Sequence, residues 1–237
     1  TLARHLDGLL RPKAGRVLLD EAPTAELRVA DMARTVGLCF QSPDRHIFSS
    51  NVRDEVEFGP RHLGLDEAEA FARTIAALEL VGLGDQLGTH PDDLGETRRK
   101  LLTIASVLAM QTPVVVLDEP TTGLDARGTA LVGGIIGDLV AEGRSVVGIS
   151  HDMRFVAESF DRIVVLDDGR VTLSGTPAEV FAEASWPLLR SAGLEPPPAA
   201  ITGARLGLGS TPTEDALVAI LMAAHDDEHP RPLDSAP

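Results

Sequence analysis

The fold is decided by the stretch from residue 114 to residue 125, which reads Val114-Val-Val-Leu-Asp-Glu-Pro-Thr-Thr-Gly-Leu-Asp125. Its first four residues are apolar and mostly β-branched, a composition that predicts a short, buried strand of a parallel sheet. Two carboxylates, Asp118 and Glu119, follow where that strand should end. Because ligands of open α/β sheets bind outside the carboxyl ends of the strands, these acids can hold a hydrated metal ion and orient a water molecule. A solvated acidic turn is the alternative interpretation of the same residues.

Other strands and helices alternate around this stretch. Apolar runs predict strands at residues 35–40, 145–149 and 162–166, and helical spacing predicts helices at 1–10, 66–80, 98–110 and 126–141. Asp66 offers an N-cap to the second of these helices, with Glu69 three residues later. This alternation predicts an α/β fold in which helices pack on the faces of a mostly parallel sheet.

Composition excludes several classes of function. The chain has 237 residues, of which 43% are hydrophobic, and a formal net charge of −15. This length predicts one large domain, or one domain with an appendage. No run of about 18 apolar residues is present, so the chain is not expected to span a membrane. The negative charge argues against a nucleic-acid partner, which normally requires a basic surface.

Two more polar residues follow predicted strands. Gln41 comes after the strand at 35–40, and His151 comes after the strand at 145–149. An amide oxygen can reach a metal ion or a water, and a histidine can donate to a phosphate oxygen. Taken alone, each is ordinary: a glutamine at a strand end, a capping or surface histidine. Because the carboxyl ends of parallel strands share one edge of a sheet, we expect both residues to lie near Asp118 and Glu119.

These motifs, in this order, resemble those of the nucleotide-binding subunits of ABC transporters. The resemblance is closest to the energy-coupling factor group, which energises uptake of vitamins and metal ions. Residues 37–44, 47–48 and 55–60 resemble its Q-loop region, residues 114–125 its Walker B strand and D-loop, and residues 149–152 its H-loop. The likeness continues through residues 161–170 and 175–181 and covers residues 1 to about 195.

The resemblance implies a P-loop NTPase-like, mostly parallel sheet with flanking helices and an inserted helical subdomain. It places an ATPase domain at residues 1–190, with the helical subdomain at about 52–110, and a linker and tail at 191–237. The implied activity is ATP hydrolysis with ATP and Mg²⁺ as cofactors.

Roles follow from the resemblance residue by residue. Gln41 would sense and hold Mg²⁺, Asp118 would hold Mg²⁺ through water, and Glu119 would polarise the attacking water. His151 would contact the γ-phosphate, and Asp125 would face another subunit across a dimer.

The implied partners are a second ABC ATPase subunit, identical or different, a transmembrane scaffold protein and a substrate-binding membrane subunit. The dimer would work at the cytoplasmic face of the membrane. A soluble ABC ATPase outside transport is an alternative, but such proteins usually carry tandem cassettes, coiled-coil insertions and basic surfaces, which are not visible in this sequence.

The phosphate cradle is the first departure from the family pattern. A P-loop has the form Gly-x-x-x-x-Gly-Lys-Ser/Thr and surrounds phosphates with backbone N–H groups and a lysine. The sequence contains no such string. Thr1 and the five residues after it resemble the residues that come directly after that motif in the family. We therefore expect that the sequence starts just after the P-loop, without the first strands. Thr1 should then lie beside the nucleotide, and the fragment should be inactive alone.

The second departure is the signature segment, which we define as Leu94-Gly-Glu-Thr-Arg98 and which usually reads Leu-Ser-Gly-Gly-Gln. It would close over the nucleotide of the opposite subunit through Leu94, Gly95, Glu96, Thr97 and Arg98. A carboxylate about 5 Å from a phosphate oxygen costs roughly 3 kcal/mol at an effective dielectric near 20, about a hundredfold in affinity. Glu96 could instead point outward and favour the helix N-terminus. A catalytically impaired subunit in an asymmetric dimer is therefore a further hypothesis.

Overall fold

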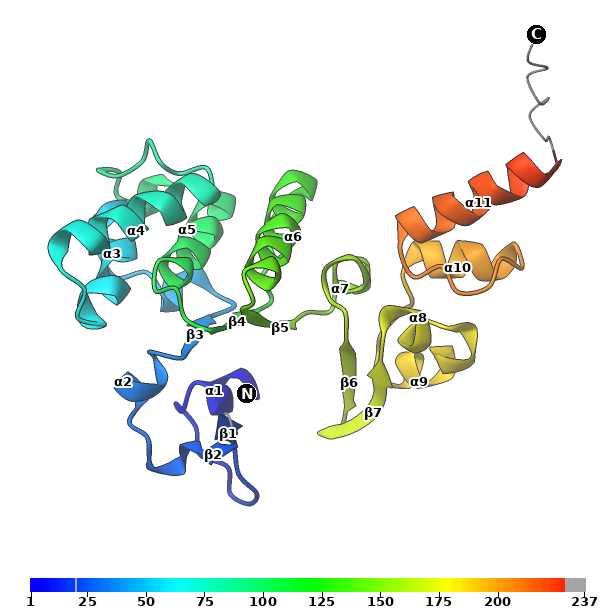
Figure 1. Cartoon of the computed structure of the whole chain (residues 1–237), viewed down its shortest axis with the longest axis horizontal. Coiled ribbons are helices and arrows are strands. Elements are labelled where there is room, and N and C mark those ends of the chain that lie inside the picture. The colour runs from blue at the N-terminus through cyan, green and yellow to red at the C-terminus, as the bar shows by residue number, and fades with distance from the viewer. Residues whose placement is uncertain (20, 229–237) are drawn as a thin grey trace, which may run out of the picture. The chain divides into compact units, whose positions relative to one another are not determined.

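The chain divides into two compact units between Ser150 and His151 in the computed structural model, which describes residues 1–19 and 21–228. In the first unit, drawn from blue to green in Figure 1, the elements before the central strand are α1 (Ala3–Leu6), β1 (Leu18–Leu19), β2 (Ala22–Pro23), η1 (Thr24–Glu26), α2 (Val29–Met32), β3 (Val36–Cys39), η2 (Pro43–Arg45), α3 (Val52–His62), α4 (Glu67–Leu80), η3 (Pro91–Asp93) and α5 (Glu96–Leu108). The elements that complete this unit are β4 (Val114–Asp118), α6 (Ala126–Ala141) and β5 (Ser145–Ile149).

The centre of the first unit is a parallel sheet with the strand order β3-β4-β5. Its register pairs Cys39 with Leu117 and Asp118 with Ile149. The middle three residues of β4 are fully buried, as their apolar and β-branched side chains require. The structure therefore confirms the predicted α/β fold and its parallel sheet.

Both faces of the sheet are covered within this unit. On one face, Ala3 of α1 and Met32 of α2 pack against Val36, Leu38 and Val116. On the other face, α5 packs against β3. A Cβ added at Gly37 would lie 2.8 Å from the Val107 side chain, so the close approach of the helix requires glycine at this position in the strand.

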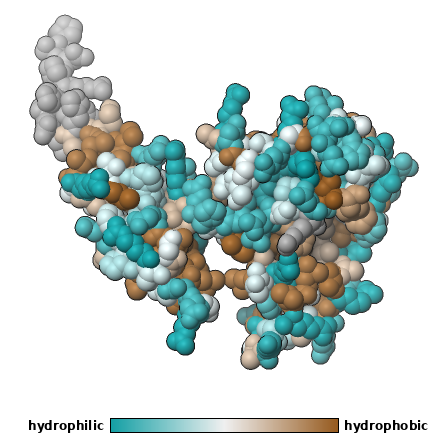
Figure 2. Space-filling view, turned by 180° about the vertical axis from the view of Figure 1, so that it is seen from behind, coloured by the Kyte–Doolittle hydropathy of each residue, from teal (hydrophilic) through white to brown (hydrophobic). Residues whose placement is uncertain are grey.

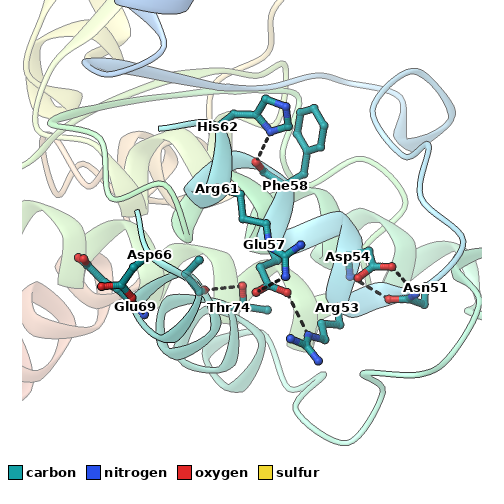
Figure 3. A network of polar contacts seen from close by, with 11 residues as sticks. Asn51, Arg53, Asp54, Glu57, Phe58, Arg61, His62, Asp66, Glu69 and Thr74 are labelled. Atoms are coloured by element: carbon teal, nitrogen blue, oxygen red, sulfur yellow. Dashed lines mark hydrogen bonds and ion pairs between the residues drawn. The ribbon is translucent and has the colours of Figure 1, made fainter. Parts of the chain in front are cut away.

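The helices α3, α4 and α5 pack on one another and form the helical segment of residues 52–108 (Figure 1). The starts of α3 and α4 are specified locally, because Asn51 and Asp66 accept hydrogen bonds from the backbone N–H groups three residues ahead. Figure 3 shows a buried carboxylate in this segment: Glu57 accepts hydrogen bonds from Arg53 at 3.0 Å and Arg61 at 3.1 Å. Both arginines lie one helical turn from Glu57, so the charge is compensated within α3.

Most predicted boundaries are confirmed to within two residues. The helix α6 and the strand β5 begin and end as expected, and α4 starts directly after the predicted cap Asp66. The opening helix is shorter than expected and ends at Leu6. Gly8 adopts a left-handed backbone with φ of 80°, which ends the helix before the last two leucines of its pattern.

The second unit has a core of its own. Its elements are α7 (Met153–Ser159), β6 (Ile163–Asp167), β7 (Arg170–Gly175), α8 (Pro177–Val180), η4 (Glu183–Ser185), α9 (Trp186–Ser191), α10 (Pro198–Arg205) and α11 (Glu214–Glu228). The strands β6 and β7 pair antiparallel, joined by a turn in which Asp168 and Gly169 both have positive φ. Phe181 and Leu189 lie at the centre of the core and are almost fully buried.

The predicted linker and tail fall within this unit. From residue 191 onward the described residues form α10 and α11, and Ala199 and Ala200 of α10 are buried. Residues 229–237 of that segment lie outside the described residues. The domain boundary near residue 190 stays a prediction.

Exposed apolar side chains occur in both units. Figure 2 shows hydrophobic residues mixed with hydrophilic ones on the face that it draws. Among exposed apolar side chains are Phe48 and Phe58 in the first unit and Val164 and Val171 in the second. Within residues 1–19 and 21–228, no helix combines the length and the apolar character that a membrane crossing requires.

Candidate functional site

The predicted residues of the first unit gather where β3 and β4 end. Gln41 lies two residues after β3, Asp118 is the last residue of β4, and Glu119 follows it. The two strands are parallel neighbours, so the three residues lie at one edge of the sheet. We call this group, Gln41 with Asp118 and Glu119, the strand-end edge. The side chains of Asp118 and Glu119 are partly buried, and Gln41 is exposed.

Glu119 has an unusual backbone. Its φ is 49°, in the left-handed region that residues with a Cβ rarely adopt. The conformation is held by a hydrogen bond of 2.8 Å from its N–H to the carbonyl of Ile149, and its carboxylate accepts a bond of 3.4 Å from the Thr122 hydroxyl. Such strain persists only where the surroundings hold it, and it recurs at functional sites.

One residue of the edge was not anticipated from the sequence. Lys100 of α5 is 1% exposed, and its ammonium donates hydrogen bonds to the carbonyls of Phe40 (3.3 Å), Gln41 (2.9 Å) and Asp118 (3.5 Å). Burial lowers the pKa of Lys100, and the charges of Asp118 and Glu119 oppose that shift. The only signal in the sequence is that Lys100 directly precedes Leu101 and Leu102, at the start of the part of α5, residues 100–108, that is buried throughout.

Polar contacts hold the loop that follows Gln41 against α3 and α5. Glu55 of α3 is 2% exposed and accepts hydrogen bonds from the backbone N–H groups of Phe48 (3.0 Å) and Ser49 (2.9 Å). Asp44 forms an ion pair with Arg99 of α5. Between the loop, the start of α5 and Thr122 lies a cavity of about 400 Å³. Its lining residues are Gln41, Ser42, Pro43, Asp44, Glu96, Arg99, Lys100 and Thr122.

The signature segment forms the start of α5. Leu94 is buried, Gly95 occupies the N-cap position, and Glu96 is the first helical residue and is exposed, as is Arg98. The Thr97 hydroxyl donates a bond of 3.1 Å to the Gly123 carbonyl.

The Glu96 carboxylate lies against Gly123, so closely that a Cβ added there would come within 3.2 Å of its Oε1. Gly123 has φ of 80°, a conformation that also favours glycine. The segment therefore contacts the loop of residues 121–125 in its own chain.

The remaining predicted residues belong to other elements of the first unit or to the second unit. Asp125 caps α6 by accepting a bond of 2.8 Å from the Gly128 N–H. Thr1 is exposed before α1, and its carbonyl is 3.1 Å from the Nδ1 atom of His5. His151 is exposed and is the first residue of the second unit. Its proximity to Asp118 and Glu119 therefore stays a prediction.

The donor set at the edge suits one kind of metal ion. Among the described residues, no three His, Cys, Asp or Glu side chains gather into a metal-binding cluster. Mg²⁺ needs no such cluster, because it binds one or two oxygen ligands of the protein, keeps several waters and takes its other ligands from phosphates. The Asp118 carboxylate and the Gln41 amide oxygen fit this requirement.

Comparisons with known proteins find relatives by sequence and by structure. Residues 1–122 match the sequence profile of the family described as "ABC transporter". The chain is 42% identical over 214 residues to the energy-coupling factor transporter ATP-binding protein EcfA1 of Symbiobacterium thermophilum, a match that covers 90% of this chain and 74% of the relative. It is 41% identical over 199 residues to EcfA of Methanoculleus marisnigri, covering 84% and 71%.

A solved structure is also similar. It is CbiO1 of Clostridium perfringens, described as part of the ABC transporter complex cbiONQ. The two chains are 32% identical with a TM-score of 0.69, and the match covers 86% of this chain and 81% of that one.

Proposed function

The chain belongs to the ABC transporter family of ATP-binding proteins, and on that premise we propose that it is the ATP-hydrolysing subunit of an importer of the energy-coupling factor type. In this role, ATP binding and hydrolysis at a dimer interface drive uptake of a vitamin or a metal ion. The names of the relatives EcfA and EcfA1 support this assignment over a soluble ABC ATPase outside transport.

The observation that carries the proposal is the strand-end edge. In a member of this family, Asp118 and Gln41 would hold Mg²⁺ beside the terminal phosphates of ATP, with Asp118 acting partly through water. When bound, Mg²⁺ neutralises charge that develops on the phosphates. Glu119, turned by its left-handed backbone, orients and polarises the attacking water. In the same proposal, His151 would donate to the γ-phosphate.

A dimer and membrane partners belong to the same proposal. Asp125 and the signature segment would face a second ATPase subunit, and the Gln41 loop with α3 would contact a transmembrane scaffold that carries a substrate-binding subunit. Phe48 is 64% exposed and Phe58 is 42% exposed on this loop and helix, and their rings pack edge to face at 4.7 Å. Exposed aromatic pairs of this kind are typical of binding surfaces. The subunit would therefore work at the cytoplasmic face of the membrane.

A second candidate function is that of a catalytically impaired subunit in an asymmetric dimer. It is favoured by Glu96, which brings a carboxylate to the segment that would approach the partner's γ-phosphate. The exposed position of Glu96 beside Gly123 leaves that carboxylate at the surface where the partner would bind. The two candidates differ in how fast this composite site turns over ATP.

The catalytic assignment is tested with Glu119→Gln in the subunit as its host produces it, within the assembled transporter. Loss of a general base typically costs about 10²- to 10⁴-fold in rate. We expect hydrolysis and transport to fall by at least about a hundredfold, while ATP binding is retained. The matched control is Glu142→Gln, an exposed glutamate after α6. Unchanged hydrolysis in the Glu119 variant would remove the assignment.

A further inference from the structure

Lys100 is the largest charged side chain that the described chain buries almost completely. It lies on α5 directly before Leu101 and Leu102 and one turn before Ile104, all three of which are buried. Taking an ammonium out of water is costly unless all its protons are donated. A lysine kept at such a position therefore needs a specific set of acceptors.

Three backbone carbonyls supply those acceptors, and they belong to two different strands. The carbonyls of Phe40 and Gln41 continue from β3, and the carbonyl of Asp118 ends β4. Three donors of one ammonium thus meet three acceptors, at distances of 2.9 to 3.5 Å. The lysine joins the two strands just beyond the last residue pair of their ladder, where β3 and β4 no longer exchange hydrogen bonds.

The same helix carries the signature segment. Glu96 and Lys100 are four residues apart, one helical turn, so a shift of the start of α5 also moves the ammonium. Nearby polar contacts on α5 do not duplicate this link. Thr103 donates within its own helix to the Lys100 carbonyl at 2.8 Å and lies 3.4 Å from the Cys39 Sγ atom, which belongs to β3 alone, and Ser106 donates to the Leu102 carbonyl at 3.0 Å.

We propose that Lys100 is a positioning residue for the Mg²⁺-binding part of the site. It holds the backbone of Gln41 in register with that of Asp118, and it moves both when the start of α5 shifts. The inference rests on the proposed function, since it names a further residue of that same site. Lys100 touches neither nucleotide nor metal in this role. It acts through the peptide groups that it holds.

The test compares Lys100→Met, a substitution of similar shape without donors, with Ser106→Ala as matched control on the same buried helix. The first measurement is hydrogen exchange of the nucleotide-free and metal-free assembled subunit at the amides of Gln41, Ser42 and Glu119. We expect exchange there to accelerate about tenfold or more in Lys100→Met and to stay as in wild type in Ser106→Ala. The second is the Mg²⁺ concentration that half-saturates ATP hydrolysis. We expect it to rise by roughly 10- to 100-fold, as when other residues that orient metal ligands are lost.

The outcomes separate this inference from the proposed function. If Lys100→Met matches Ser106→Ala in both measurements, while Glu119→Gln still abolishes hydrolysis, Lys100 is not a positioning residue and only this inference falls. If wild type shows no Mg²⁺-dependent hydrolysis, the proposed function falls, and hydrogen exchange alone decides whether Lys100 holds the edge. If Lys100→Met does not fold, Lys100→Gln is measured in the same way. Failure of both to fold would assign Lys100 a structural role and overturn the inference.

Discussion

Two successive turns of α5 differ sharply in their surroundings. The first turn begins with Glu96, which is exposed and lies against the glycine loop of residues 121–125. One turn later, Lys100 is buried and holds three carbonyls of the strand-end edge. The outer turn is thus exposed, while the inner turn contacts the chain's own strand-end edge, whose Gln41 and Asp118 are proposed to hold Mg²⁺. Because both turns belong to α5, this helix can connect the signature segment with the strand-end edge.

The physical consequences of a substitution should differ in the same way. An exposed charge is screened by water and salt, so its removal changes an interaction by a modest amount. A buried ammonium has no water to replace its partners, and its loss removes a hydrogen-bond donor from each of three carbonyls. We therefore expect changes at Glu96 to adjust the activity and changes at Lys100 to disrupt it.

The largest effect that we expect at the outer turn comes from Glu96→Gln, which removes the carboxylate and keeps its shape. At about 5 Å from a phosphate oxygen, the repulsion lies between roughly 1 kcal/mol in water and 3 kcal/mol in a partly dry interface. We expect turnover at the composite site that receives this segment to rise about tenfold. The measurement is single-turnover ATP hydrolysis in dimers whose other site carries Glu119→Gln.

The control for this change is Glu67→Gln, which alters the first residue of α4 in the same way, far along the chain from the signature segment. It should leave turnover unchanged. If Glu96→Gln does not accelerate the composite site, the carboxylate is not repulsive. If both sites already turn over at equal rates in wild type, the dimer is not asymmetric.

A smaller effect is expected from Thr97→Val, which removes the hydroxyl that donates to the Gly123 carbonyl. The bond lies near the surface, so its loss should cost about 1 kcal/mol or less in the free energy of unfolding. Because the loop of residues 121–125 follows Glu119, we expect hydrolysis to fall about two- to fivefold. Thr202→Val in α10, which loses a bond of similar length to the Pro198 carbonyl, measures the effect of the substitution alone. Equal losses in both variants would separate the signature segment from the loop.

The sequence predicts the strand-end edge because its residues follow directly from local rules. The apolar run before Asp118 requires a buried strand, and parallel pairing then brings Gln41 to the same edge. The caps of α4 and α6 are likewise predictable, because Asp66 and Asp125 act within their own turns. Each of these inferences needs only a few neighbouring residues.

The features that the sequence does not predict depend on contacts across the chain. Lys100 binds carbonyls that lie 60, 59 and 18 residues away in sequence. Because every residue type has a backbone carbonyl, the sequence does not show which residues will accept its hydrogen bonds. The left-handed backbone of Glu119 is also not predictable from the sequence, because glutamate is not a residue type that favours positive φ. Lys100 begins the run of residues 100–108 that is buried in α5, and only the structure shows the acceptors that its ammonium finds there.

The smallest effect that we expect concerns His46, which lies in the loop between Gln41 and α3 beside the inner turn. Its Nδ1 atom is buried and lacks a hydrogen-bond partner among the described residues. Burial lowers the pKa of His46, Glu55 on α3 acts to raise it, and Lys100 on α5 acts to lower it. The unfolded chain therefore binds a proton more readily than the folded one, so stability should fall as the pH drops below about 6.5.

We expect His46→Gln to reduce the loss of Tm between pH 7.5 and pH 5.5 by no more than about 3 °C, since 1 kcal/mol moves the Tm of a protein of this size by roughly 2–4 °C. Thermal unfolding at both pH values measures it. His62→Gln, an exposed histidine at the end of α3, should leave the loss unchanged. If His46→Gln lost as much Tm as wild type, protonation of this loop would not oppose folding. The loop that contains His46 would then be buried beside α5 without making the stability of the protein depend on acid.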